Sequence, residues 1–133
     1  MIQMQQQVQM TPNDARYRLF MGMFYRSVGQ IDLAISELAE AVKLTPGKQS
    51  MLGNLGQLYV EKKDYSKAIE VLKRSYELEK KNSEAGRLLF AAYLKAGDRA
   101  SAISVINQMI QEDPSFKVQG EQYIKDVQAG KNP

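Results

Sequence analysis

The sequence of 133 residues contains no cysteine and no histidine. Without these residues there is no disulfide, no thiol nucleophile, no Cys/His zinc site and no imidazole general base. Catalysis would have to rest on carboxylates, lysines, tyrosines or serines. We therefore expect a protein without enzymatic activity, metal ion or cofactor.

Long apolar runs and a strong charge excess are also absent. No segment approaches the ~20 apolar residues of a membrane span. The first 14 residues lack the features of a signal peptide. The net charge is only +3, and the excess lies mainly in residues 48–82, which argues against nucleic-acid binding. We expect a soluble cytoplasmic protein without membrane insertion. It would be periplasmic or extracytoplasmic if it belongs to a larger membrane protein.

The sequence does repeat itself, with a period of 34 residues. Tyr25, Tyr59 and Tyr93 have this spacing. Three further columns repeat in the same way: Ala34, Ala68 and Ala102; Leu38, Leu72 and Ile106; and Met21, Leu55 and Leu89. Because several independent columns share one period, the pattern indicates tandem repeats.

Within each period the apolar residues follow helical spacing, as Met51, Leu55 and Leu58 do. Short polar turns divide each period, at Gly29-Gln30, at Lys62-Lys63-Asp64 and at Gly97-Asp98. Glycine suits the end of a helix and aspartate the start of the next. Each period is therefore predicted to be a helix–turn–helix unit, with helices at 13–28 and 31–44, at 48–62 and 65–79, and at 83–96 and 99–112.

The two ends of the chain differ from the repeats. A seventh helix is predicted at 115–128, with Ser115 as its cap. Its apolar stripe is predicted to cover the last unit, and comprises Phe116, Gln119, Tyr123, Ile124 and Val127. Residues 129–133 are predicted to be a tail. Residues 1–12 hold five glutamines and no charge, and are predicted to be a tail or an extension of the first helix.

The repeat columns resemble the tetratricopeptide repeat family. The first unit carries Met21-Gly22, Tyr25, Gly29, Ala34, Leu38, Ala41 and Pro46, and the later units repeat much of this pattern. The resemblance implies an all-α, right-handed superhelix within residues 13–114. Its three helix–turn–helix units lie at about 15–48, 49–82 and 83–116, and the helix at 115–128 caps them. Gly22 and Gly56 are predicted to be small because the two helices of each unit cross there.

Three residues depart from the family pattern. Phe90 occupies the column of Gly22 and Gly56, and Met109 replaces a small residue. These two changes predict a wider helix crossing in the third unit. Lys80 stands where a proline would stop the second helix, and it predicts a longer, straighter helix through 80–82.

The resemblance also implies a function, because the family mostly binds proteins. The first helix of each unit is expected to line a concave face that binds a peptide or a partner helix. Its basic residues would hold acidic groups. The alternative is a solvated face without a ligand. The residues expected on this face are Arg16, Leu19, Met23, Arg26, Asn54, Gln57, Glu84, Arg87, Ala91, Leu94 and Lys95.

One subtype of the family is predicted not to apply. Some members grip the C-terminal carboxylate of heat-shock chaperones with Lys, Asn, Asn, Lys and Arg. The matching positions here hold Leu19, Met23, Asn54, Glu84 and Leu88. Because only Asn54 agrees, the chain is expected not to bind chaperone tails in this way.

Two alternative functions stay open. In the first, the chain is a self-associating scaffold whose groove is filled by residues 1–12 of the same or a neighbouring copy. In the second, it is a soluble C-terminal module of a bacterial membrane protein, because 11–17 and 44–49 resemble repeat segments of O-antigen ligase-like or polymerase-like proteins. The paired glutamates Glu37 and Glu40 are expected to be solvated rather than catalytic, and neither a phosphate loop nor a dinucleotide motif is present.

Overall fold

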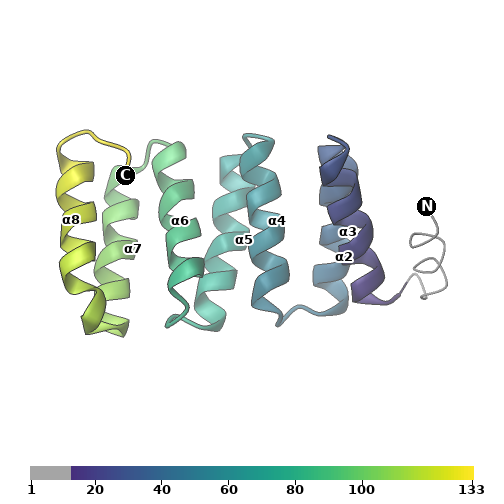
Figure 1. Cartoon of the computed structure of the whole chain (residues 1–133), viewed down its shortest axis with the longest axis horizontal. Helices are drawn as coiled ribbons and strands as arrows, with labels where there is room; N and C mark the ends of the chain where they lie inside the picture. Colours follow the sequence, from purple (N-terminus) through teal and green to yellow (C-terminus); the bar gives the residue numbers. More distant parts are fainter. Residues whose placement is uncertain (1–12) are drawn as a thin grey trace.

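The computed structural model describes residues 13–133, which fold into α-helices joined by short turns. The helices occur in pairs that follow one another along the long axis (Figure 1). Their bounds lie within two residues of the predicted ones. They are α2 (Ala15–Ser27), α3 (Ile31–Leu44), α4 (Gln49–Glu61), α5 (Tyr65–Leu78), α6 (Ser83–Lys95), α7 (Arg99–Glu112) and α8 (Lys117–Gln128), with a 3₁₀ turn, η1 (Pro114–Phe116), before α8. The expectations for residues 1–12 lie outside the described residues.

Local side chains fix where the helices begin and end. The carboxylate of Asp98 accepts hydrogen bonds from the backbone N–H and the hydroxyl of Ser101, at 3.0 and 2.6 Å, and caps α7. The turns before α3 and α7 use Gly29 and Gly97 at φ +80° and +82°. The middle unit has Lys63 at φ 66° in the equivalent place, where glycine would be less strained.

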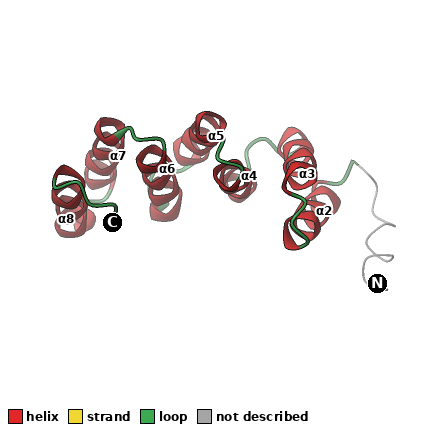
Figure 2. Ribbon diagram, turned by 90° about the horizontal axis from the view of Figure 1, so that it is seen from above, coloured by secondary structure: helices red, strands yellow, loops and turns green. Residues whose placement is uncertain are grey.

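The first helices of the units lie along one side of the stack and the second helices along the other. Figure 2 shows α2, α4, α6 and α8 on one side and α3, α5 and α7 on the opposite side. The apolar core lies between these two rows and between successive units. One cluster joins α3, α4 and α5 around Leu38, Leu52 and Leu58, and the other joins α5, α6 and α7 around Leu72, Leu89 and Ile106.

The predicted small residues lie at the tightest helix crossings. A Cβ added to Gly22 would lie 2.6 Å from Cδ2 of Leu38, and one added to Gly56 would lie 2.4 Å from Cδ2 of Leu72. Both distances are shorter than any van der Waals contact. These glycines therefore allow the two helices of a unit to approach each other.

In the third unit the glycine lies at Gly86, four residues before the position that Gly22 and Gly56 occupy in the other units. A Cβ on Gly86 would lie 2.6 Å from Sδ of Met109, so this glycine makes room for the larger Met109. Phe90, in the glycine column, stacks on Tyr123 of α8 with 5.6 Å between the ring centroids. Phe90 is therefore large because it packs on the capping helix. The Met109 side chain fills the space beside Gly86, and the wider crossing expected for this unit stays a prediction.

Two local predictions are wrong. Ser115 is not the cap of the last helical segment: its backbone N–H and hydroxyl donate to Asp113, at 3.1 and 2.6 Å, so Asp113 is the cap. The expected long helix through 80–82 does not form either. α5 ends at Leu78, and Asn82 caps α6.

Hydrogen bonds explain why α5 ends without a proline. Nε2 of Gln49 donates to the backbone carbonyls of Ser75 and Glu79, at 2.8 and 3.2 Å. Asn82 Nδ2 donates to the side-chain oxygen of Gln49 at 2.6 Å, and Asn82 Oδ1 accepts from the backbone N–H of Glu84. These contacts satisfy carbonyl groups at the end of α5 and N–H groups at the start of α6.

The capping helix covers the last unit as predicted. Val127 is 1% exposed and Phe116 is buried, and Tyr123 and Ile124 pack against the same core. Gln119 of the predicted stripe is exposed. Gly120 takes its place at the contact, where an added Cβ would lie 2.8 Å from Cδ1 of Ile110.

Candidate peptide-binding groove

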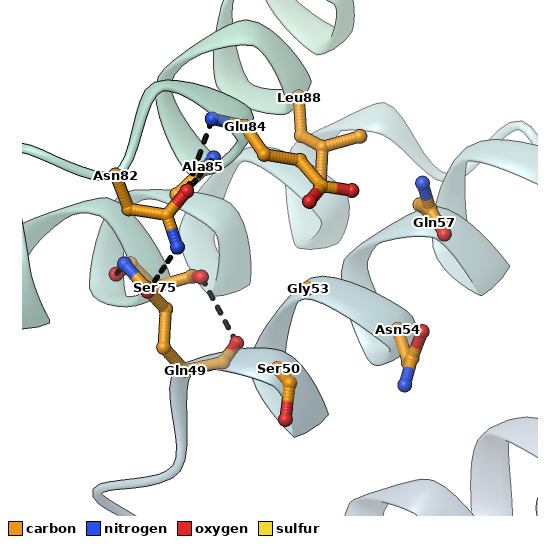
Figure 3. A pocket seen from close by; sticks show the side chains of 10 residues that line it. All are labelled: Gln49, Ser50, Gly53, Asn54, Gln57, Ser75, Asn82, Glu84, Ala85 and Leu88. Atoms are coloured by element: carbon orange, nitrogen blue, oxygen red, sulfur yellow. Dashed lines mark hydrogen bonds between the residues drawn. The ribbon is translucent and has the colours of Figure 1, made fainter.

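The first helices present two neighbouring hollows on one face of the stack. The polar hollow, of about 180 Å³, lies between α4 and α6 (Figure 3). The apolar hollow, of about 230 Å³, adds the end of α2. Gln57 and Leu88 line both hollows, which together make up the candidate groove. The α6 positions 84, 88, 91 and 95 line it because they recur at i, i+4, i+7 and i+11 on one helix face.

The polar hollow is built mainly from neutral groups. Asn54 and Gln57 of α4 offer amide donors and acceptors, and Glu84 of α6 brings one carboxylate. Gly53 and Ser50, which have little or no side chain, line the α4 side of the hollow and leave space there. The Gln49 and Asn82 side chains, held by the hydrogen bonds described above, form one edge of it (Figure 3). A ligand here would meet amide groups set on a rigid frame.

The apolar hollow has a hydrophobic floor and charged rims. Val60, Leu72 and Leu88 line it together with Ala91 and Ala92. Its charged residues are Arg26, Glu61 and Lys95. Arg26 and Glu61 form an ion pair that joins α2 to α4. An acidic ligand would therefore have to compete with Glu61 for Arg26.

Six of the predicted residues line these two hollows, one on α2, two on α4 and three on α6. They are Arg26, Asn54, Gln57, Glu84, Ala91 and Lys95.

The other five predicted residues lie elsewhere. Arg16 forms an ion pair with Asp14 at 2.9 Å and is 73% exposed. Its hydrogen bonds lower the pKa of the Asp14 carboxyl below the ordinary value. Met23 is exposed, whereas Leu19 and Leu94 pack against the cores. Arg87 lines a separate hollow, which contains Lys80, Lys81 and Asp113.

Sequence reasoning missed part of the groove. Leu88 was considered only as a failed clamp position, yet it lines both hollows. The sequence did contain a signal for Leu88. It follows Asn54 by one period of 34 residues and therefore occupies the equivalent position in the next unit. Gln49 and Asn82 carried no such signal, because their contacts join residues 26 to 33 positions apart.

The rest of the described chain offers no obvious centre for chemistry. Across residues 13–133 no cluster of three acidic side chains is placed to hold a metal ion. None of the helices in this range is long and apolar enough to cross a membrane. The buried hydroxyl of Tyr76 has no hydrogen-bond partner within this range, and burial raises the pKa of this phenol.

Comparison with known proteins decides the family. Tetratricopeptide repeat models match residues 15–48 and residues 59–120. The chain belongs to the tetratricopeptide repeat family. Its paired helices and terminal α8 correspond to three such repeats and a capping helix.

One curated protein and one solved structure illustrate what this chain is similar to. The general transcriptional corepressor trfA of Dictyostelium discoideum is 28% identical over 99 residues, which are 74% of this chain but 7% of that protein. The chain thus spans a small part of this relative. The crystal structure of MamA has a TM-score of 0.78 at 24% identity, covering 96% of this chain and 74% of that one.

Two further structures of the same fold contain chaperone peptides. The TPR2B domain of yeast Sti1, in complex with an Hsp70 peptide, has a TM-score of 0.72 at 16% identity and covers 88% of this chain and 98% of that one. The first TPR domain of Spaghetti (RPAP3), bound to the Hsp90 peptide SRMEEVD, has a TM-score of 0.72 at 15% identity and covers 90% and 94%. At these identities the likeness shows the fold alone.

Proposed function

We propose that this chain is a non-catalytic interaction module that binds a peptide or a helix of a partner protein in the groove formed by α2, α4 and α6. The observation that supports this most directly is that the two hollows share Gln57 and Leu88 and are together lined by residues of all three first helices. A groove of this kind suits an elongated ligand better than a small molecule. The peptides in two domains of the same fold agree with such a role.

The groove chemistry favours a partner other than a chaperone tail. The clamp positions hold Leu19, Met23, Glu84 and Leu88 beside Asn54. Glu84 would repel a terminal carboxylate near the polar hollow. Leu88 and Ala91 would instead contact apolar side chains of a ligand, while Asn54 and Gln57 would hydrogen-bond polar groups.

A peptide-display selection tests this function. A random peptide library is selected on the immobilised chain, and the enriched peptides are titrated against two variants. Ala91→Glu places a charge in the apolar hollow, whereas Asn107→Glu places the same charge on an exposed position of α7. We expect Ala91→Glu to weaken binding at least about tenfold and Asn107→Glu to leave it unchanged. Equal binding by the two variants, or a selection that enriches no peptide, would refute the proposal.

A further inference from the structure

The outer face of α2 carries an apolar stripe that the later units bury. Tyr17, Met21 and Phe24 are spaced at i, i+4 and i+7 and are each partly exposed. The matching residues one and two periods later are Met51 (2% exposed), Leu55 (5%) and Leu58 (1%), then Ala85 (4%), Leu89 (3%) and Ala92 (1%).

The buried residues of this stripe pack on the second helix of the preceding unit. Met51, Leu55 and Leu58 of α4 share a core cluster with Leu38 and Val42 of α3. Ala85, Leu89 and Ala92 of α6 share the other cluster with Leu72 and Tyr76 of α5. By the same rule, the stripe on α2 fits a helix that precedes it in the stack.

The sequence just before α2 continues the columns of those second helices. Met4 lies one period before Leu38, and Val8 lies one period before Val42. Both later residues are buried, at 0% and 7%. Met1 likewise precedes Ile35, and Thr11-Pro12 precedes Thr45-Pro46, where the proline follows the end of a helix.

One residue of the segment departs from the small-residue column. Gln7 stands in the column of Ala41, Ser75 and Met109. Met109 shows that this column accepts a long side chain where the facing helix has no side chain, as at Gly86. A long residue in this column, such as Gln7, therefore does not argue against the match.

We propose that residues 1–12 dock on the outer face of α2, against Tyr17, Met21 and Phe24, at the place that α3 takes on α4 and α5 takes on α6. The segment adjoins α2 directly through Asn13 and Asp14, as 45–48 joins α3 to α4. Its apolar columns match the face it would cover. In this proposal residues 1–12 stabilise α2 by covering its outer face, and they do not fill the groove.

Thiol labelling tests the proposal cleanly, because the chain has no cysteine. Phe24→Cys introduces a single thiol on the outer face of α2. Its reaction with a thiol reagent is followed in the full chain, alone and combined with Met4→Asp and Val8→Asp. The matched control carries Gln5→Asp and Gln9→Asp. The column of Gln9 holds the exposed Lys43 and Glu77, and the column of Gln5 holds the partly buried Ala39 and the exposed Lys73 and Asn107.

We expect the thiol to react at least about tenfold faster in the Met4→Asp/Val8→Asp chain than in the control chain. The same change should lower the melting temperature of a chain that keeps Phe24, by at least about 4 °C relative to the control substitutions. Protection should not depend on protein concentration. Fast labelling in the parent, or equal rates in the two substituted chains, would overturn the proposal. Protection that grows with concentration would assign the face to a second copy and overturn it equally.

Discussion

Two glycines of α4 allow a sharp test of the packing argument. Gly53 and Gly56 are both buried and lie one turn apart on the same helix. A Cβ on Gly53 would meet only Cδ1 of Leu88, at an ordinary 3.7 Å. A Cβ on Gly56 would lie 2.4 and 2.5 Å from Cδ2 and Cγ of Leu72, which is 1% exposed. Alanine should therefore have opposite effects at the two positions.

The expected magnitudes follow from two opposing contributions. Replacing glycine by alanine inside a helix stabilises by about 0.8–1 kcal/mol. At Gly53 nothing opposes this gain, so Gly53→Ala should raise the free energy of unfolding by about 0.5–1 kcal/mol. At Gly56, overpacking against the branched carbon of Leu72 costs about 1–3 kcal/mol. Gly56→Ala should then lower the free energy of unfolding by about 1–2 kcal/mol.

Urea unfolding followed by circular dichroism measures both variants, and Leu72→Ala supplies the control. If the clash with Leu72 is the cause, Gly56→Ala should cost less in the Leu72→Ala background, which a double-mutant cycle detects. Gly56→Leu should be worse than Gly56→Ala, and far worse than Lys62→Leu, which removes only an exposed ion pair with Asp32. Equal stability of Gly53→Ala and Gly56→Ala would show that α4 and α5 do not cross at Gly56.

Three further predictions concern the junctions and the groove. Gln49→Ala should cost about 0.5–1.5 kcal/mol in chemical unfolding, because partly buried groups lose hydrogen-bond partners, and hydrogen exchange should speed up at 79–82. The peptide SRMEEVD should bind no better with a free carboxylate than with an amidated C-terminus in a calorimetric titration, since the clamp residues are missing; a clear preference for the free acid would contradict this. Hydrogen bonds from Ser101 lower the pKa of the Asp98 carboxyl, so the cap contributes stability above the ordinary aspartate pKa and loses it as the pH falls through the lowered value. Asp98→Ala should therefore reduce the melting temperature at pH 7, and the difference should shrink in acid.

The helices could be predicted from the sequence because their signals are local. The 34-residue period, the turn glycines and the capping aspartates all act within a few residues of a helix end. Even the missing turn glycine at Lys63 did not hide the turn, since Asp64 supplies the next cap. The break between α5 and α6 at 80–82 was mispredicted for the opposite reason. It depends on Gln49, 26 residues before Ser75, whose carbonyl it binds.

The site was harder to predict because a helix face does not reveal its partners across units. Arg26 was expected to attract acidic ligands, but Glu61 lies 35 residues away in the sequence and pairs with it. Arg87 shares α6 with Glu84 and Ala91, yet it lines the hollow on the side of α7 and α8. In both cases the residue was placed on the correct helix, and its role depends on which neighbouring helix it meets.

These same contacts limit which partner the groove can select. A groove that binds acidic C-terminal peptides needs cationic side chains that are not already paired with carboxylates of the protein itself. Here Arg26 is paired with Glu61, and Glu84 adds a further negative charge at the polar hollow, so Lys95 is the other cation that lines the two hollows. In the proposed complex, apolar contacts with Leu88 and its neighbours would then supply most of the affinity, and Lys95 would hold at most one acidic group. A backbone shared with domains that bind chaperone peptides does not by itself transfer their specificity, because specificity depends on the particular side chains that line the groove.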